Sequence, residues 1–175
     1  MSASQTSTHT DLPANIGTIW TINDGTAGMR LQAVALANAL AAARQPKTRK
    51  PTITQANTPQ DFVVTPPPLC RYLPWLSQIW PVAALDRILP SSCPELPVGK
   101  EFPNILITCG RRMAGLSIAI RRLARCHRAP TRTIHIQDPR LPARYFDILI
   151  VPQHDPTRGP NVITCMASLN RLTMH

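Results

Sequence analysis

The stretch Ile19–Gly28, with the sequence IWTINDGTAG, decides the fold of this chain. Its apolar half has the composition of a buried strand, and its polar half carries two glycines. Apolar residues at helical spacing follow it at Met29, Ala33, Leu36, Ala37 and Leu40. We therefore expect a buried strand over 17–22, a turn, and a helix from Gly28 to about Arg44, which together begin an α/β fold.

Three later stretches repeat this change from apolar to polar. They read ILITCGRR at 105–112, IHIQDPR at 134–140 and ILIVPQHD at 148–155. In open α/β sheets, ligands bind outside the carboxyl ends of the parallel strands. Four apolar runs with polar endings therefore predict one site assembled from several loops.

The other expected elements complete a Rossmann-like, mostly parallel sheet with flanking helices. Apolar runs predict strands at 105–108, 133–136, 148–151 and 162–165, a short strand at 62–64, and a helix over 112–126. Short helices fit at 69–76 and 77–89, between prolines. The connection over 138–145 has eight residues, fewer than the dozen usual for a parallel crossover. An extended segment would satisfy it, and so would a hairpin.

Length and composition bound the domain organisation. The 175 residues suffice for one core. We expect a disordered Ser/Thr-rich tail at 1–15 and a single Rossmann-like domain at 16–175. Within that domain, 12 of the 19 prolines lie between Pro46 and Pro103, which predicts an irregular insertion at about 46–103.

Charge and cysteine usage limit the function classes. The net charge is +10, with arginines far outnumbering lysines. This excess favours anionic partners such as phosphorylated metabolites or anionic lipid, although arginine-rich codon usage explains it equally well. Aromatic residues make up only 5% of the chain, which disfavours nucleic acid. Five cysteines without metal-ligand spacing predict no metal site and a cytoplasmic location, and no cofactor is indicated.

The first polar turn has the position of an anion-binding loop. Asp24, Gly25 and Gly28 follow the strand and precede the helix, where unpaired backbone N–H groups favour a negative ligand. The carboxylate of Asp24 would repel a phosphate placed beside it, so a sugar hydroxyl is an equally good ligand. A plain strand-to-helix turn is the structural alternative.

The second turn pairs a thiol with two arginines. Cys109 at a helix start could act as a nucleophile, but such cysteines are more often small buried residues. Gly110 allows a close approach of the backbone to a ligand. Arg111 and Arg112 are better candidates for anion binding, because a guanidinium grips phosphate at two points.

The last two endings supply hydrogen-bonding and titratable groups. Gln137, Asp138 and Arg140 follow one strand, and His154 and Asp155 follow the next. A histidine beside a carboxylate suggests a general base, with loop structure as the alternative.

Two further groups have structural explanations. We interpret His135, inside a strand, as a core histidine with its hydrogen bonds satisfied. Arg121, Arg122, Arg125 and Arg128 share one sector of the predicted helix. That sector is either a solvated outer face or a surface for an anionic membrane or partner.

These motifs, in this order, resemble the bacterial relatives of the plant "elongated mitochondria" fission protein, a family often labelled nucleoside-diphosphate-sugar epimerase. The resemblance covers about residue 16 to the C-terminus. It rests on Trp20 with the DG-x-AG motif at 24–28, on Gln32, on CGRR at 109–112, on QDPR at 137–140, on P-x-HD at 152–155 and on Asn161-Val162. Where the family commonly has Glu, this chain has Gln153.

The resemblance implies a two-domain, glycosyltransferase-like architecture of the GT-B type, in which two Rossmann-like halves enclose a cleft. This chain would correspond to the N-terminal half, with the second domain absent. In that architecture the C-terminal half makes most contacts to the nucleotide sugar, and the N-terminal half mainly presents the acceptor side. The plant relative is regarded as an adaptor that recruits a dynamin-like GTPase to a membrane.

We therefore expect a sugar phosphate or nucleotide sugar to bind at the strand endings, with little or no turnover by this chain alone. The binding residues would be Asp24, Gly25, Gly28, Gly110, Arg111, Arg112, Gln137, Asp138, Arg140, His154, Asp155 and Asn161. The candidates for catalysis are His154, Asp155 and Asp24. The alternative is a non-catalytic adaptor that binds a protein partner or lies peripherally on an anionic membrane.

Overall fold

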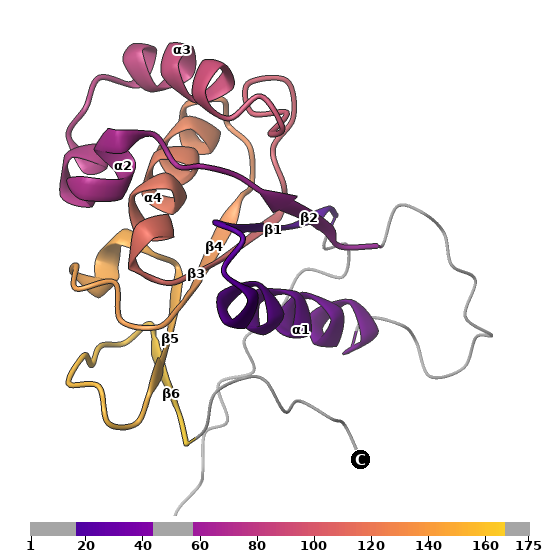
Figure 1. Cartoon of the computed structure of the whole chain (residues 1–175), viewed down its shortest axis with the longest axis vertical. Coiled ribbons are helices and arrows are strands. Elements are labelled where there is room, and N and C mark those ends of the chain that lie inside the picture. The colour runs from indigo at the N-terminus through magenta and orange to yellow at the C-terminus, as the bar shows by residue number, and fades with distance from the viewer. Residues whose placement is uncertain (1–16, 44–57, 167–175) are drawn as a thin grey trace, which may run out of the picture.

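The computed structural model describes residues 17–43 and 58–166. Within these residues, six strands form one parallel sheet in the order β2-β1-β3-β4-β5-β6 (Figure 1). The strands are β1 (Ile19–Asn23), β2 (Gln60–Val63), β3 (Ile105–Cys109), β4 (Arg132–Ile136), β5 (Ile148–Pro152) and β6 (Val162–Cys165). The predicted Rossmann-like α/β fold is confirmed. The tail expected at 1–15 lies outside the described residues.

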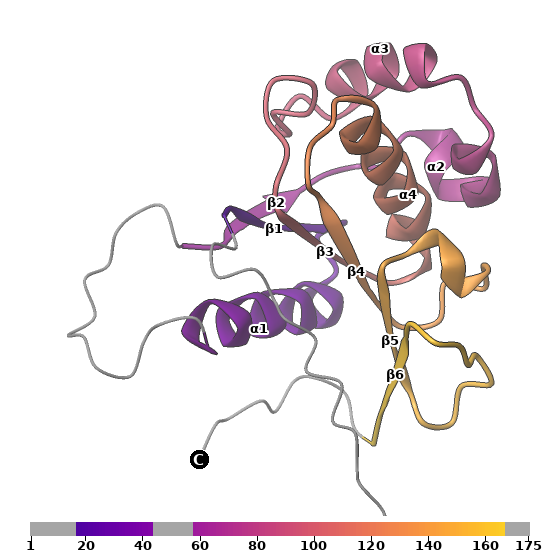
Figure 2. The same cartoon turned by 180° about the vertical axis from the view of Figure 1, so that it is seen from behind.

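Helices cover both faces of the sheet. They are α1 (Ala27–Ala43), α2 (Pro68–Tyr72), α3 (Val82–Ser92) and α4 (Arg111–Cys126), with the 3-10 helices η2 (Pro74–Gln78) and η3 (Ala143–Tyr145). Helix α1 lies on one face, and α2, α3 and α4 lie on the other (Figures 1 and 2). Because both faces are buried, the central strands read as continuous apolar runs rather than as alternating patterns.

Each face has its own core. On the α1 face, Ala33 and Ala37 pack over Ile107 of β3. On the opposite face, Leu116 of α4 packs over Trp20 and Leu106. The alternation of side chains along β1 and β3 sends neighbouring residues into different cores.

A glycine lets α2 approach α4 closely. A Cβ atom added at Gly115 would lie 2.2 Å from the carbonyl oxygen of Cys70, which is far inside van der Waals contact. Gly115 is buried in the middle of α4, so the oxygen has no open space to retreat into. Helix α2 of the proline-rich segment therefore packs directly against α4, with backbone in contact with backbone at Gly115.

The proline-rich segment is more regular than its composition predicts. Its described part, 58–103, supplies the edge strand β2 and the helical turns of α2, η2 and α3. Proline stands at the start of α2 and of η2, where the missing N–H has no helical partner to lose. The prolines therefore delimit short helices rather than prevent them, in keeping with the short helices predicted between prolines, while the insertion itself stays a prediction.

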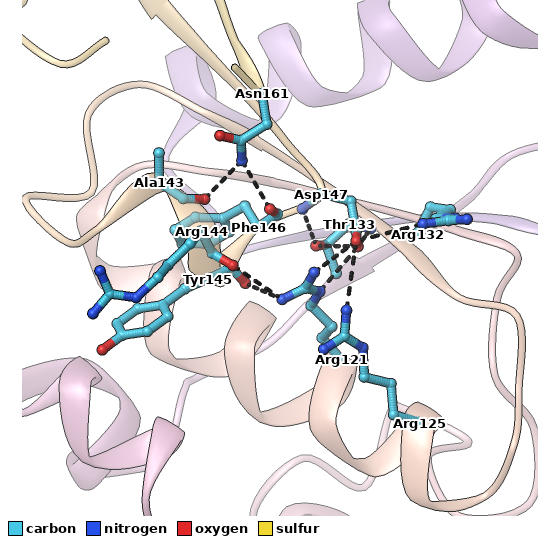
Figure 3. Close-up of polar contacts among 10 residues, drawn as sticks. All are labelled: Arg121, Arg125, Arg132, Thr133, Ala143, Arg144, Tyr145, Phe146, Asp147 and Asn161. Carbon is cyan, nitrogen blue, oxygen red and sulfur yellow. Dashed lines mark hydrogen bonds and ion pairs between the residues drawn. The ribbon is translucent and has the colours of Figure 1, made fainter. Parts of the chain in front are cut away.

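The short connection between β4 and β5 is an extended crossover and not a hairpin. The two strands are parallel, with His135 opposite Leu149. The crossover holds the 3-10 turn η3 and the buried Phe146, whose ring stacks on His135 at 4.7 Å between centroids. The amide of Asn161 donates hydrogen bonds to the carbonyl oxygens of Ala143 and Phe146, which fixes this segment against β6 (Figure 3).

The arginine sector of α4 is a structural clamp. Arg121 donates to both carboxylate oxygens of Asp147, at 3.0 and 2.6 Å, and also to the carbonyl oxygen of Tyr145 (Figure 3). Arg122 donates to the carbonyl oxygens of Ser77 and Trp80, both at 2.7 Å. The expectation of a solvated or partner-binding face is therefore wrong for these two side chains, because both guanidinium groups satisfy backbone or carboxylate oxygens of the fold.

Asp147 is the centre of that clamp. It accepts hydrogen bonds from the backbone N–H and the hydroxyl of Thr133, and Arg125 and Arg132 each lie 3.8 Å from it. Burial alone would raise the pKa of the Asp147 carboxyl, but the hydrogen bonds from Arg121 and Thr133 and the charge of Arg121 outweigh it. The pKa therefore lies below its ordinary value, and the carboxylate stays charged inside the fold.

Candidate functional site

The four polar strand endings meet along the carboxyl edge of the sheet, the edge at which the parallel strands end. The pairing register aligns Cys109 with Ile136 and Ile136 with Ile150, so the residues that follow them leave the sheet at similar heights. Helix α4 begins one residue beyond Gly110, and α1 begins close after Asp24. Two helix N-termini therefore open at the same edge.

The turn after β1 is shaped by hydrogen bonds from its own side chains. The buried Asn23 accepts from the backbone N–H of Gly25 at 3.0 Å, and Asp24 accepts from the N–H of Thr26 at 3.2 Å. Gly25 has φ +82°, a conformation that L side chains rarely adopt. These contacts hold the turn in place, so Gly25 is needed for its backbone conformation, and it is not among the residues that line the two cavities described below.

Asp61 of β2 anchors the same turn from the side. It accepts from the Thr21 hydroxyl at 2.5 Å, from the Asn23 amide at 2.9 Å and from Arg30 at 2.6 Å. The edge strand supplied by the proline-rich segment therefore fixes the first turn of the site. This role could not be predicted from local sequence, because Asp61 lies 40 residues from Thr21, 38 from Asn23 and 31 from Arg30.

Two adjoining cavities occupy the carboxyl edge. The smaller one, about 420 Å³, lies between the starts of α1 and α4. It is lined by Asp24, Thr26, Met29, Cys109, Gly110, Arg111, Arg112 and Gln137. Burial raises the pKa of the Asp24 carboxyl, but hydrogen bonds from Thr26 and the nearby Arg112 guanidinium, 3.6 Å away, bring the pKa below its ordinary value. Asp24 is therefore a hydrogen-bond acceptor here and not a proton donor.

The larger cavity, about 630 Å³, extends from the edge over the α1 face of β4, β5 and β6. Its lining is Gln32, Arg111, Ile136, Gln137, Asp138, Arg140, Ile150, Pro152, His154, Asp155, Pro156 and Cys165. Arg111 and Gln137 line both cavities, so the two adjoin at these residues. A ligand of two or three groups could therefore reach from one cavity into the other.

Arg111 differs from the other arginines of α4. It is exposed, it lines both cavities, and no hydrogen bond or ion pair holds it within 17–43 and 58–166. It also stands in the first turn of α4, which holds no acidic residue. A cation at a helix N-terminus opposes the helix dipole and destabilises the fold slightly, so this placement is unfavourable without an anion.

Left-handed backbone brings the QDPR residues to the cavity. Gln137 has φ 74° and Arg140 has φ 53°, and Asp138 accepts a hydrogen bond from the N–H of Arg140 at 2.8 Å. Side chains rarely tolerate such φ values, and strained residues gather at functional sites.

His154 and Asp155 face the larger cavity but form only a loose pair. The histidine Nε2 lies 3.8 Å from the carboxylate, beyond hydrogen-bonding distance, and the His154 side chain is 83% exposed. Arg158 holds the loop by donating to the carbonyl oxygen of Gln153 at 2.9 Å and to that of Asp155. The geometry suits ligand contact better than an oriented general base.

Cys109 and His135 are core residues beneath the site. Burial raises the pKa of the Cys109 thiol to about 12, and nearby Asp24 adds to the effect, so the thiol is neither charged nor accessible. Burial likewise lowers the pKa of His135 to about 3. Its Nδ1 shares a 2.8 Å hydrogen bond with Thr108, but its Nε2 has no partner in the described residues. The expected core position is confirmed, whereas full hydrogen bonding is not.

Two other predicted binding residues do not line a cavity. Gly28 lies in the first turn of α1, with open space around its Cα. Asn161 precedes β6 and therefore sits at the opposite, amino edge of the sheet, where its amide binds the crossover. That Asn161 contacts a ligand stays a prediction, and its amide is occupied by the two carbonyl oxygens of the crossover. The motif identified Asn161 as a candidate, but the direction of β6 determines that it lies at the amino edge of the sheet.

The structure also adds residues that the strand endings did not indicate. Gln32 comes from the second turn of α1, and Cys165 from the end of β6, which runs level with Pro152. The sequence also predicted the strand at 162–165, but no charged residue stands at its end, so its ending was not counted with the other four.

Two further searches cover only the described part of the chain. No group of three or more His, Cys, Asp or Glu side chains gathers there in a way that could hold a metal ion. None of its helices is both long and apolar enough to cross a membrane.

One protein family matches this chain. The model of the family described as "Mitochondrial fission ELM1" matches residues 27–175, most of the 175-residue sequence, and the chain belongs to this family. The match includes the CGRR, QDPR and P-x-HD motifs and begins just after Asp24 and Gly25. A search of curated proteins and a search of solved structures each gave no significant match.

Proposed function

We propose that this member of the mitochondrial fission ELM1 family binds a phosphorylated sugar, of the sugar-phosphate or nucleotide-sugar type, at the carboxyl edge of its sheet. The observation that carries the proposal is Arg111. It stands at the positive end of α4, lines both cavities, and has no partner in the described residues. A phosphate would offset the repulsion between this guanidinium and the helix dipole. It would accept hydrogen bonds from the guanidinium and from the free backbone N–H groups at the start of α4.

The groups around Arg111 fit the rest of such a ligand. Asp24 in the smaller cavity and Asp138 and Asp155 in the larger are hydrogen-bond acceptors placed away from the helix start. Carboxylates of this kind bind sugar hydroxyls and repel a second phosphate. The charge pattern therefore favours a ligand with one anionic segment flanked by hydroxyl groups.

We propose binding with little or no turnover by this chain alone. His154 is almost fully exposed and is not oriented by Asp155, while the Asp24 carboxyl has a depressed pKa. His154 is therefore not held in place as a general base, and the Asp24 carboxyl does not serve as a proton donor. A GT-B-like partner domain on the far side of the cleft would supply the remaining groups, as the family resemblance implies.

Titration of the full chain with inorganic pyrophosphate and with UDP-glucose, followed by ¹H–¹⁵N NMR, tests the proposal. We expect saturable shifts at Gly110, Arg111 and Gln137, and binding weaker by about ten- to a hundredfold after Arg111→Ala, since one charge-assisted contact is worth about 1.5–3 kcal/mol. Arg87→Ala is the matched control, because Arg87 is an exposed arginine on α3, outside both cavities. Equal losses in the two variants, or no saturable shift at millimolar ligand, would reject the site.

A peripheral membrane role is the second candidate, and one surface favours it. Tyr72, Trp75 and Ile79 of the α2–η2 segment are 70%, 49% and 66% exposed, and Arg71 lies over the Tyr72 ring at 5.3 Å. Tyrosine and tryptophan prefer the interface between lipid and water, and the net charge of +10 suits an anionic surface.

Co-sedimentation with vesicles tests this role. We expect the chain to bind phosphatidylserine-containing vesicles better than phosphatidylcholine vesicles, and the Trp75→Ser/Ile79→Ser double variant to bind less. Arg121 and Arg122 are unsuitable probes, because both clamp the fold. Binding that survives the double variant would remove this surface from consideration.

A further inference from the structure

Gln32 is a polar side chain in an apolar position. It is only 8% exposed, and its neighbours at helical spacing, Met29 and Leu36, pack against the core on the α1 face of the sheet. Within the described residues the Gln32 side chain makes no hydrogen bond, although it lines the larger cavity. The amide makes no hydrogen bond inside the described fold and opens into the cavity, so an apolar side chain such as leucine or methionine would pack equally well at this position.

The surroundings of Gln32 indicate what its amide could meet. Ile136, Ile150 and Cys165 form an apolar floor on the same face of the sheet, and Pro152 closes one side. The charged groups of this cavity belong to the loops at the carboxyl edge: Arg111, Asp138, Arg140, His154 and Asp155. A ligand group held against this floor would therefore be largely uncharged, with hydrogen-bonding atoms at one edge.

We propose that Gln32 recognises a nucleobase in the larger cavity and so sets the direction in which a nucleotide sugar binds. This inference rests on the proposed function, since it assumes that Arg111 holds the phosphates. A primary amide presents one donor and one acceptor in a plane, which matches the adjacent donor and acceptor on the edge of a base. The isoleucine and proline side chains would contact its flat faces.

The direction follows from the position of Arg111 between the cavities. With the base over β4 and β5, the diphosphate lies at Arg111 and the start of α4, and the sugar lies in the smaller cavity beside Asp24. Asp138 or Asp155 then accepts from the ribose hydroxyls, as acidic residues do in other nucleotide sites. The reverse direction would place the base beside Asp24 and Arg112, an ion pair rather than an apolar surface.

Calorimetric titration of the full chain with four probes tests this assignment: pyrophosphate, glucose 1-phosphate, UDP-glucose and ADP-glucose. We expect at least one nucleotide sugar to bind about tenfold or more tightly than glucose 1-phosphate. Gln32→Leu should remove that advantage while leaving the affinity for pyrophosphate unchanged. The matched control is Gln78→Leu, because Gln78 belongs to η2, which packs against α4 on the other face of the sheet.

A second measurement separates recognition from a structural role. If Gln32 serves a ligand, Gln32→Leu should not lower the urea midpoint of unfolding, because the substitution removes no hydrogen bond within the described residues. A lower midpoint together with unchanged nucleotide affinity would overturn the proposal.

The outcomes also distinguish this inference from the proposed function. If pyrophosphate binds but the nucleotide sugars bind no better than glucose 1-phosphate, only the role of Gln32 is rejected. If pyrophosphate does not bind, and no nucleotide sugar binds either, both are rejected.

Discussion

The two ends of α4 use arginine in opposite ways. At the C-terminal end, Arg121 and Arg122 are half-buried and hold Asp147 and the backbone of η2 and of the crossover. At the N-terminal end, Arg111 and Arg112 are exposed and face cavities, and only Arg112 has a partner, at 3.6 Å. The same residue type therefore builds the fold at one end and remains available to a ligand at the other.

The helix dipole explains what this difference means. A positive side chain stabilises the C-terminal end of a helix and opposes the N-terminal end. Arginines at the C-terminal end of α4 therefore need no explanation beyond stability. The pair at the N-terminal end opposes the dipole, and the proposed phosphate would offset that cost.

Loss of the clamp should be the most damaging change. Arg121→Ala leaves Asp147 buried without its main partner, and breaking a buried pair in this way costs about 3–5 kcal/mol of unfolding free energy. The pair qualifies because each side chain is only 12% exposed. Urea unfolding measures the loss, with Arg125→Ala as the control, since Arg125 is exposed and 3.8 Å from the same carboxylate. If the two variants lost similar amounts of unfolding free energy, burial would not determine how much each arginine contributes to stability.

The middle of α4 should be nearly as sensitive to size. In Gly115→Ala the new methyl group meets the Cys70 carbonyl oxygen, and overpacking of this kind costs about 1–3 kcal/mol. Gly28→Ala is the control in α1, where nothing lies within 4 Å and alanine favours the helix. Thermal unfolding of both variants checks the prediction. An unchanged midpoint for Gly115→Ala would show that α2 can move away from α4.

The clamp should also make stability depend on pH. Because the folded-state pKa of Asp147 lies below its value in the unfolded chain, its contribution is complete above the unfolded value and is lost as the pH falls through the folded value. The stability difference between the wild type and Asp147→Asn should therefore be largest at pH 7 and shrink below about pH 4. Urea midpoints at pH 7, 5 and 3 measure this trend. A difference that grows toward acid pH would contradict the assignment.

The open end of α4 should show the smallest effect, and with the opposite sign. Arg111→Glu replaces an unfavourable cation at the helix start with a favourable anion, which should raise the unfolding free energy by about 0.3–1 kcal/mol at low salt. The same variant should lose pyrophosphate binding. Urea unfolding and pyrophosphate titration of Arg111→Glu together test whether Arg111 lowers stability and supports binding. A variant less stable than the wild type would contradict the first of these expectations.

The strand endings were readable because both of their signals are local. An apolar run such as Ile105–Cys109 predicts a buried parallel strand, and the rule that ligands bind at carboxyl ends places the residues after it. For this reason Arg111, Gln137 and Asp138 were predicted and do line the cavities. That they bind a ligand stays a prediction.

Other roles could not be read from the chain, because they depend on partners far away in sequence. The helical period placed Arg121 and Arg122 on one face, but only the packing of η2 and of the crossover gave them oxygens to bind. Asn161 looked like part of the site until the direction of β6 put it at the amino edge. Asp61 was overlooked for the same reason, since its partners lie on β1 and α1.

The sequence by itself determined the order of the elements, the parallel sheet and the polar carboxyl edge, because strand burial and turn chemistry are written in neighbouring residues. Only the tertiary structure decided which polar groups support the fold and which stay available. A guanidinium or an amide has the same hydrogen-bonding capacity wherever it stands. Arg121 is structural because packing brings Asp147 to it, whereas Arg111 and Gln32 line cavities because packing leaves them without a partner in the described residues.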